Sequence, residues 1–257
     1  MKLERRYVEK PWGRRSLPSI FSPPARERIG EVWFEGGEDL PLLAKYLFTS
    51  ERLSVQVHPN DEQARSHGLE RGKSECWYIL DAEPGAKLGL GFKEALTNNQ
   101  LRQSALDGSI VDLMQWHPVK PGDFFSVPPG TVHAIGGGIS LLEFQQNSDV
   151  TYRLYDYGRP RELHLDAGTE VSQAEPYDPS LAAHLTASDE QTLVTGPHFT
   201  LVWTTRDALQ GRLRWVMPLD GSVRSGADVA GAGECLLLGP LDELETDGEP
   251  LLIGAPC

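Results

Sequence analysis

The segment 122–133, which reads GDFFSVPPGTVH, constrains the fold more than any other part of this chain. Its residues 123–127 have the composition of a β-strand, and Pro128 to Gly130 predict a tight turn at the end of that strand. His133 follows three residues after Gly130, where the next strand would begin and would point it inward from a rigid scaffold. The spacing G-x5-P-x-G-x2-H therefore predicts a metal ligand at this position rather than a purely structural histidine.

This spacing resembles the second motif of the cupin superfamily, whose members are small β-barrels that hold a metal with inward-facing side chains. A second candidate strand lies upstream, where residues 54–58 read SVQVH. Because side chains alternate between the two faces of a strand, Ser54, Gln56 and His58 share one face, and the valines between them take the other. Gln56 and His58 are therefore placed to reach one metal ion.

A third candidate strand, residues 73–80 (KSECWYIL), contributes the carboxylate of Glu75. Gln56, His58, Glu75 and His133 would together supply two imidazoles, one carboxylate and one amide oxygen. This mixed set of ligands suits one Zn²⁺ per chain with room for water or substrate. Mn²⁺, Fe²⁺ and Co²⁺ also fit such a set.

Several longer sequence blocks occur in a fixed order over about the first 165 residues. They are KPWG at 10–13, LSVQVHPND at 53–61, KSE at 73–75, and GDFFSVPPGTVHAIGGGISLLEFQQNSDVTYRLYDYGR at 122–159. In these blocks the chain resembles type I phosphomannose isomerase (mannose-6-phosphate isomerase) in its short bacterial form. The resemblance implies a metal-dependent isomerase of the cupin superfamily that acts in carbohydrate metabolism.

The resemblance also implies a role for each residue that matches a family motif. The metal ligands fall on Gln56, His58, Glu75 and His133. The active-site arginine falls on Arg153, the pocket lysine on Lys73, the pocket acids on Glu143 and Asp149, and an aromatic wall on Trp12.

The implied reaction interconverts mannose 6-phosphate and fructose 6-phosphate, and it moves a proton between C2 and C1 of the open-chain sugar. Its intermediate is a cis-enediol with negative charge on oxygen, which a divalent metal stabilises. The base must lie within hydrogen-bond reach, and Lys73, Glu143 and a water molecule on the metal are alternatives for it. Arg153 would stabilise the enediolate or hold substrate oxygens.

The phosphate group of such a substrate requires donors that lie away from the metal. Arg159 is the favoured phosphate contact, because a guanidinium forms two-point hydrogen bonds to phosphate. In longer members of the family a lysine takes the matching place, so this chain departs from the pattern there. Ser54, on the same strand face as Gln56, would add a hydroxyl group.

Two other classes of protein remain possible from the sequence. One is a metal-binding cupin with a different reaction, such as an epimerase or a dioxygenase, although dioxygenase cupins usually carry an H-x-H motif and this chain has Gln56 at the first position. The other is a non-catalytic protein that binds a sugar phosphate. Glu75, His133 and Arg153 are all present, which favours the isomerase.

The charge of the chain excludes some partners. With 37 acidic and 24 basic residues, the net charge is −13, which argues against a general nucleic-acid or membrane surface. The sequence contains no apolar run long enough to span a membrane, and its first residues have no signal-peptide core, so a cytoplasmic protein is expected. The predicted partner is a small sugar phosphate, and nothing in the sequence specifies an oligomeric state.

Short apolar runs separated by Gly, Pro and Asn predict a mainly β fold, namely a cupin-type jelly-roll barrel with a smaller, degenerate C-terminal β-barrel. We expect a catalytic domain over 1–178, with a short helical insertion at about 93–116 for which Thr97 would be the N-cap. A smaller β domain is expected over 179–257, with strands at 199–204, 213–218, 235–238 and 251–254. No metal site is expected in this second domain, because His184 and His198 lack the motif settings described above.

Overall fold

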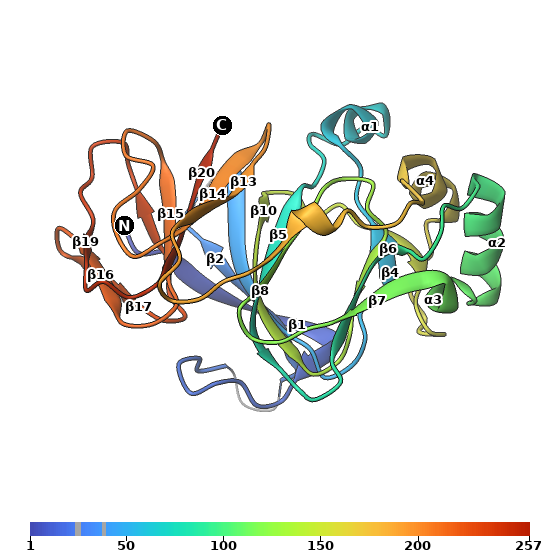
Figure 1. Cartoon of the computed structure of the whole chain (residues 1–257), viewed down its shortest axis with the longest axis horizontal. Coiled ribbons are helices and arrows are strands. Elements are labelled where there is room, and N and C mark those ends of the chain that lie inside the picture. The colour runs from blue at the N-terminus through green and yellow to red at the C-terminus, as the bar shows by residue number, and fades with distance from the viewer. Residues whose placement is uncertain (24–26, 38–39) are drawn as a thin grey trace. The chain divides into compact units, whose positions relative to one another are not determined.

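The computed structural model describes residues 1–23, 27–37 and 40–257, and strands make up most of its regular structure (Figure 1). No helix in these residues is long and apolar enough to cross a membrane. The chain forms two compact units, each assembled from separated segments. Unit 1 contains Met1–Phe48, Leu142–Asn147 and Ala183–Cys257, and unit 2 contains Thr49–Leu141 and Ser148–Ala182.

Unit 2 contains a five-stranded antiparallel sheet and a further pair of strands. Its strands are β4 (Val55–Val57), β5 (Glu75–Ala82), β6 (Lys87–Phe92), β7 (Met114–Pro118), β8 (Asp123–Val127), β9 (His133–Ile135) and β11 (Tyr152–Tyr155). The five-stranded sheet has the order β11-β4-β9-β6-β7. β5 pairs with β8 in an antiparallel arrangement.

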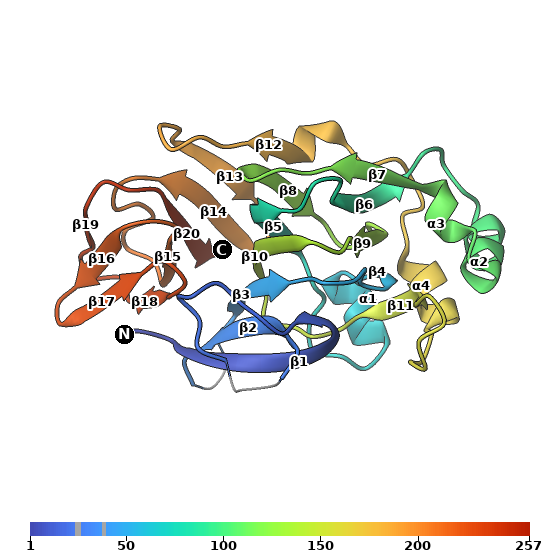
Figure 2. The same ribbon diagram turned by 90° about the horizontal axis from the view of Figure 1, so that it is seen from below.

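The helices of unit 2 are short. They are α1 (Asp61–Ser66), α2 (Asn98–Asp107), α3 (Ile110–Leu113), α4 (Leu165–Val171) and the 3-10 turn η1 (Pro179–Leu181). Both views show α2, α3 and α4 gathered beside the five-stranded sheet (Figures 1 and 2). Val55 and Val57 of β4 pack there against Leu101 of α2 and Ile110 of α3, so one face of the sheet is buried under the helices.

The helical insertion begins where the sequence predicts. Thr97 caps α2, because its side chain accepts a hydrogen bond from the Gln100 amide and the Gln100 side chain accepts one from the Thr97 amide. Gly108 ends the helix with a φ of 85°, a left-handed conformation that favours glycine. The second helix, α3, ends at Leu113, because Met114 starts β7 and pairs with Phe92 of β6.

Unit 1 consists of strands in three groups. Its strands are β1 (Glu4–Arg14), β2 (Ile29–Glu35), β3 (Leu42–Phe48), β13 (Gln191–Thr195), β14 (Phe199–Thr204), β15 (Arg214–Pro218), β16 (Ser222–Ser225), β17 (Asp228–Gly231), β18 (Leu236–Leu238), β19 (Glu245–Thr246) and β20 (Leu251–Pro256). The groups have the orders β1-β2-β3, β13-β14-β20-β15-β18 and β17-β16-β19. The strands β10 (Ile139–Gln146) and β12 (Ala182–His184) pass from one unit to the other.

Phe144 of β10 lies in the core of unit 1. It packs edge-to-face on Phe199 of β14, with ring centroids 5.1 Å apart, and on Trp215 of β15, at 6.3 Å. Gly254 of β20 lies against the same ring so closely that a β-carbon at this position would collide with it. Glycine is therefore required at residue 254 to let the aromatic ring approach the strand.

The sequence suggested a single domain boundary near residue 178. The two units are instead each assembled from separated segments of the chain. The N-terminal strand joins unit 1, because the Leu3 amide donates to the Cys235 carbonyl at 2.9 Å and Lys2 bridges to Leu236. The four strands expected in the C-terminal region are present as β14, β15, β18 and β20. β13, β16, β17 and β19 were not expected, since they are short or largely polar.

Candidate metal centre

The turn after β8 places His133 at the first position of β9. Gly130 has a φ of 86°, so this turn depends on glycine. The Gly130 amide donates to the His58 carbonyl at 2.9 Å, which ties the turn to the end of β4. His133 pairs with Gln56 of β4 on one side and with Leu90 of β6 on the other. The turn and the strand pairing thus bring two predicted ligand segments together.

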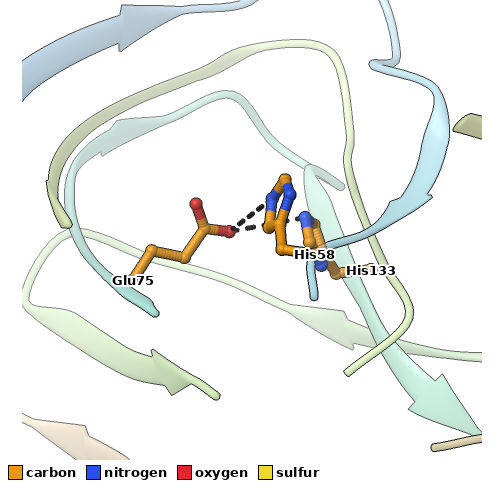
Figure 3. Close-up of side chains that lie close together, drawn as sticks. All are labelled: His58, Glu75 and His133. Carbon is orange, nitrogen blue, oxygen red and sulfur yellow. Dashed lines mark ion pairs between the residues drawn. The ribbon is translucent and has the colours of Figure 1, made fainter. Parts of the chain in front are cut away.

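His58, Glu75 and His133 form a buried cluster within unit 2 (Figure 3). Their ligand-type atoms all lie within 4.8 Å of one another. The Glu75 carboxylate points toward both imidazole rings, and its Oε1 lies 3.5 Å from His58 Nε2 and 3.4 Å from His133 Nε2 (Figure 3). Two imidazole nitrogens and a carboxylate at this spacing can hold a divalent metal ion.

Main-chain carbonyls fix the tautomers of both histidines. His58 Nδ1 lies 2.7 Å from the Val150 carbonyl oxygen, and His133 Nδ1 lies 2.9 Å from that of Thr131. Because a carbonyl oxygen can only accept a hydrogen bond, each Nδ1 carries the proton and donates it. Each Nε2 therefore presents a lone pair to the cluster, as a metal-ligating histidine must.

The charge states of the three residues also suit metal binding. Burial lowers the pKa of His58 to about 3, and the Lys73 ammonium adds to this effect. Burial likewise lowers the pKa of His133. Burial opposes ionisation of Glu75, but the charge of Lys73 and contacts with the two histidines outweigh it and hold the pKa of that carboxyl well below its usual range. At neutral pH both imidazoles are neutral and the carboxylate is ionised.

Lys73, Gln56 and Ser54 surround the cluster. Lys73 Nζ lies 2.6 Å from Glu75 Oε2 and 3.3 Å from His58 Nε2. The Gln56 amide donates to His133 Nε2 at 3.2 Å, and the Ser54 hydroxyl donates to Gln56 Oε1 at 3.1 Å. Ser54 is buried, so in this arrangement its hydroxyl holds the Gln56 side chain.

Trp77 of β5 also contacts the cluster, although no sequence motif pointed to it. Its ring packs edge-on against His133, with centroids 5.3 Å apart, and it is buried. This contact restricts the rotation of the His133 ring. An aromatic residue inside an apolar run is typical of a hydrophobic core, so a search for functional motifs does not identify it.

Arg159 belongs to a second charged group, which is centred on the buried carboxylate of Asp156. Arg161 donates to both Asp156 oxygens, at 2.6 and 2.7 Å, and Arg159 Nε lies 3.2 Å from Oδ1. Arg159 Nη2 donates to the Arg52 carbonyl at 2.5 Å. Two of its three nitrogens are therefore engaged within the protein, and Nη1 is the donor left for an anion. Sequence reasoning missed Asp156 and Arg161, because an acidic and a basic residue in a loop resemble solvated surface.

Arg153 lies directly opposite Gln56 in the β11–β4 pair, so their side chains leave the sheet on the same face. Its Nη1 donates to the Glu162 carbonyl at 2.8 Å. Burial, followed by the nearby charge of Arg161, lowers the pKa of this guanidinium. Arg153 thus connects the strand that carries Gln56 with the segment around Asp156.

Glu143, Trp12 and Asp149 are the remaining predicted residues. Glu143 belongs to unit 1, where it is buried and its Oε1 lies 3.1 Å from Lys45 Nζ. Trp12 is buried in the same unit. Asp149 belongs to unit 2 and is exposed.

A mainly β fold with two histidines and a glutamate gathered from separate segments defines a cupin-type protein with a candidate metal site. No family model matches the chain. Over 162 residues, 60% of this chain and 50% of the relative, the chain is 49% identical to the mannose-6-phosphate isomerase ManA of Bacillus subtilis. Over 169 residues it is 44% identical to a mannose-6-phosphate isomerase of Streptococcus mutans, of which 53% is covered. The matched segment thus spans about half the length of these relatives.

Solved structures are similar over nearly the whole chain. The crystal structure of the mannose 6-phosphate isomerase from Bacillus subtilis has a TM-score of 0.81 at 27% identity, with 98% of both chains covered. A mutant phosphomannose isomerase from Salmonella typhimurium, at 14% identity, shares the fold with a TM-score of 0.77 over 99% of this chain and 99% of its own. The chain is thus similar to mannose-6-phosphate isomerases in sequence over about half of their length, and in fold over nearly its whole length.

Proposed function

We propose that the chain interconverts mannose 6-phosphate and fructose 6-phosphate through a cis-enediol intermediate. The observation that supports this most directly is the buried cluster of His58, Glu75 and His133, whose two Nε2 lone pairs and ionised carboxylate converge beside Lys73. The names of the relatives support the same reaction. They do not favour a differently reacting or non-catalytic cupin.

In this proposal Gln56, His58, Glu75 and His133 hold one Zn²⁺. Gln56 would turn its amide by half a rotation, so that Oε1 rather than the N–H group faces the cluster. When bound, the metal supplies positive charge that stabilises oxyanions and orients the open-chain sugar. The fit rests on the donor set and on the two tautomers, which already present their lone pairs inward.

Lys73 and Glu143 are the proposed proton-transfer groups. Lys73 is buried, and its ion pair with Glu75 fixes the ammonium beside the cluster, where it can protonate a sugar oxygen. Glu143 is a buried carboxylate that can accept a proton from carbon. Each role requires that the group lies within hydrogen-bond reach of C1, C2 or their oxygens in the bound sugar.

Arginines are the proposed contacts to the negatively charged parts of the substrate. Arg153 Nε and Arg159 Nη1 are buried donors that make no hydrogen bond within the described residues. Arg153 would hold the enediolate oxygens, and Arg159 would contact the phosphate through Nη1. Ser54, Asp149 and Trp12 complete the proposed substrate-binding set.

The proposal is tested by metal analysis of the purified protein together with an assay that converts mannose 6-phosphate to fructose 6-phosphate. About one divalent ion per chain and clear isomerisation are expected. His133→Ala should lose most of both, because it removes one Nε2 ligand. The matched control is His184→Ala, an exposed histidine outside the cluster that should change neither. Full metal content in His133→Ala would show that the ion lies elsewhere, and an inactive, metal-loaded unmodified protein would contradict the proposed reaction.

A further inference from the structure

Unit 2 has a pocket whose lining residues include none of the proposed metal or substrate residues. Its volume is about 520 Å³, a size that accommodates a small-molecule ligand. It is lined by the start of β6, the glycines that follow β9, and residues of α3 and β7. Two of these residues, Val111 and Trp116, pack against the apolar core that lies between the sheet and the helices.

The pocket lies on the opposite face of the five-stranded sheet from the metal cluster. The apolar core includes Val55, Val57 and Ala134, which alternate along β4 and β9 with Gln56 and His133. Since neighbouring residues of a strand point to opposite faces, the metal-cluster side chains point away from the pocket. A ligand in the pocket and a ligand at the cluster would therefore occupy separate sites.

The charged residues of the pocket are mostly basic. Arg52, Lys87 and Lys93 line it, and Asp112 is the one acidic residue among its lining residues. None of the three cations forms an ion pair with a carboxylate in residues 1–23, 27–37 and 40–257; Lys93 Nζ donates instead to the Asp112 carbonyl at 2.7 Å. In a chain of net charge −13, three exposed cations around one hollow create a local site for an anion.

Aromatic rings hold Arg52 in place. Its guanidinium carbon lies 5.8 Å from the ring centroid of Trp116 and 5.8 Å from that of Tyr157. The indole of Trp116 is itself fixed, because its N–H donates to the Val111 carbonyl at 2.9 Å. A guanidinium positioned in advance loses less conformational freedom when an anion binds.

Glycines form part of the wall of this pocket. Gly85, Gly136 and Gly137 line the pocket without side chains. At Gly136 and Gly137 a β-carbon would meet main-chain oxygens of Lys87 and Ser50 at 2.4 and 3.0 Å, so glycine is required there for the local backbone packing; a β-carbon at Gly85 would meet nothing within 4 Å, so the space beside this residue is open. A doubly charged phosphoryl group suits a pocket whose lining residues include one guanidinium and two ammonium groups.

From this geometry we infer that the pocket binds the phosphoryl group of a small phosphorylated metabolite, at a site on the opposite face of the sheet from the metal cluster. Arg52 and Lys87 provide the principal charge-assisted contacts, and Lys93 provides a third cation. The inference does not depend on isomerase activity, because binding at the pocket can be measured even in a catalytically inactive protein.

The experiment is a calorimetric titration of the full-length, metal-loaded protein with adenosine 5′-monophosphate at low ionic strength, with inorganic phosphate as a competitor. Arg52→Gln/Lys87→Gln should weaken binding of the nucleotide at least about tenfold, since two charge-assisted contacts are removed. The matched control is Arg15→Gln/Arg224→Gln, which removes two exposed cations elsewhere and should change the affinity less than about twofold. His133→Ala should leave nucleotide binding intact.

Several results would overturn the inference. Unchanged nucleotide affinity in Arg52→Gln/Lys87→Gln would show that the pocket is not the binding site. An equal loss in the control pair would mean that only general charge attraction is measured. Loss of binding in His133→Ala would place the nucleotide at the metal cluster, and failure of inorganic phosphate to compete would exclude recognition of the phosphoryl group. Absence of isomerisation in the same preparations would contradict the proposed function, but it would not change the conclusion about nucleotide binding at the pocket.

Discussion

The charged group around Asp156 predicts a measurable difference between two ion pairs of the same unit. Asp156 is 2% exposed and accepts two hydrogen bonds from Arg161, whereas Asp166, which pairs with Arg102, is 92% exposed. Asp156→Asn keeps the shape of the side chain but removes its charge and one acceptor. The comparison therefore isolates the effect of burial on an ion pair formed by the same two residue types.

The magnitude follows from the exposure of each partner. Removing one member of a fully buried pair costs about 3–5 kcal/mol. Arg161 is 28% exposed, so solvent screens part of its charge, and we expect Asp156→Asn to lower the free energy of unfolding by about 2–3 kcal/mol. The coupling energy between Asp156 and Arg161 should be about 1.5–2 kcal/mol, because two charge-assisted bonds are shared. For Arg102 and Asp166 it should be below about 0.5 kcal/mol.

The assay is a double-mutant cycle for each pair, with Asp156→Asn and Arg161→Gln in one and Asp166→Asn and Arg102→Gln in the other. Urea unfolding followed by circular dichroism gives the free energies. Both pairs lie in unit 2, so the same unfolding transition reports on both. Equal coupling energies, or a value below about 0.5 kcal/mol for Asp156 and Arg161, would refute the argument that the buried carboxylate organises this segment.

Three further outcomes are expected. Arg153→Lys should lower kcat for mannose 6-phosphate more than it raises KM, because an ammonium cannot reproduce a planar guanidinium; a change in KM alone would make Arg153 a ground-state binding group. Arg159→Ala should raise KM for mannose 6-phosphate more than it changes KM for any isomerisation of free mannose. An unchanged KM would indicate that other residues bind the phosphate, with Lys73 and Ser54 as the next candidates. Phe144→Ala should destabilise unit 1 by about 3–5 kcal/mol in urea unfolding, since the ring is fully buried between Phe199 and Trp215, and a loss below about 1 kcal/mol would mean that this core collapses around the cavity.

Sequence reasoning succeeded where a local pattern fixes direction. The turn at Gly130 and the period-two alternation at residues 54–58 were sufficient to predict that His133 and Gln56 share one face, and the two residues are paired neighbours in the structure. The capping pattern at Thr97 likewise predicted the start of α2. In each case the decisive feature is either an interaction between residues close in sequence or an alternation of side chains along one strand.

Which segments combine to form each unit could not be predicted from local sequence patterns. Phe144, in the middle of the chain, packs on Phe199 and Trp215, and Leu3 bonds to Cys235. The apolar residues of a strand do not indicate which distant strand they will pack against. Short polar strands such as β16 and β17 were missed because they are defined by their pairing rather than by a buried alternation.

The metal cluster shows most clearly which part of a site a sequence specifies. Residue types identify His58, Glu75 and His133 as candidate ligands, but the direction of each histidine lone pair depends on a hydrogen bond from Nδ1 to the carbonyl of Val150 or Thr131. Every residue has a carbonyl, so no side chain at positions 150 or 131 encodes this contact. The backbone path of the segment after β10 and of the turn before β9 sets the tautomers instead. It follows that the readiness of this site for a metal is a property of the fold, and that substitutions which shift these two backbone segments should weaken metal binding even where all four proposed ligands are retained.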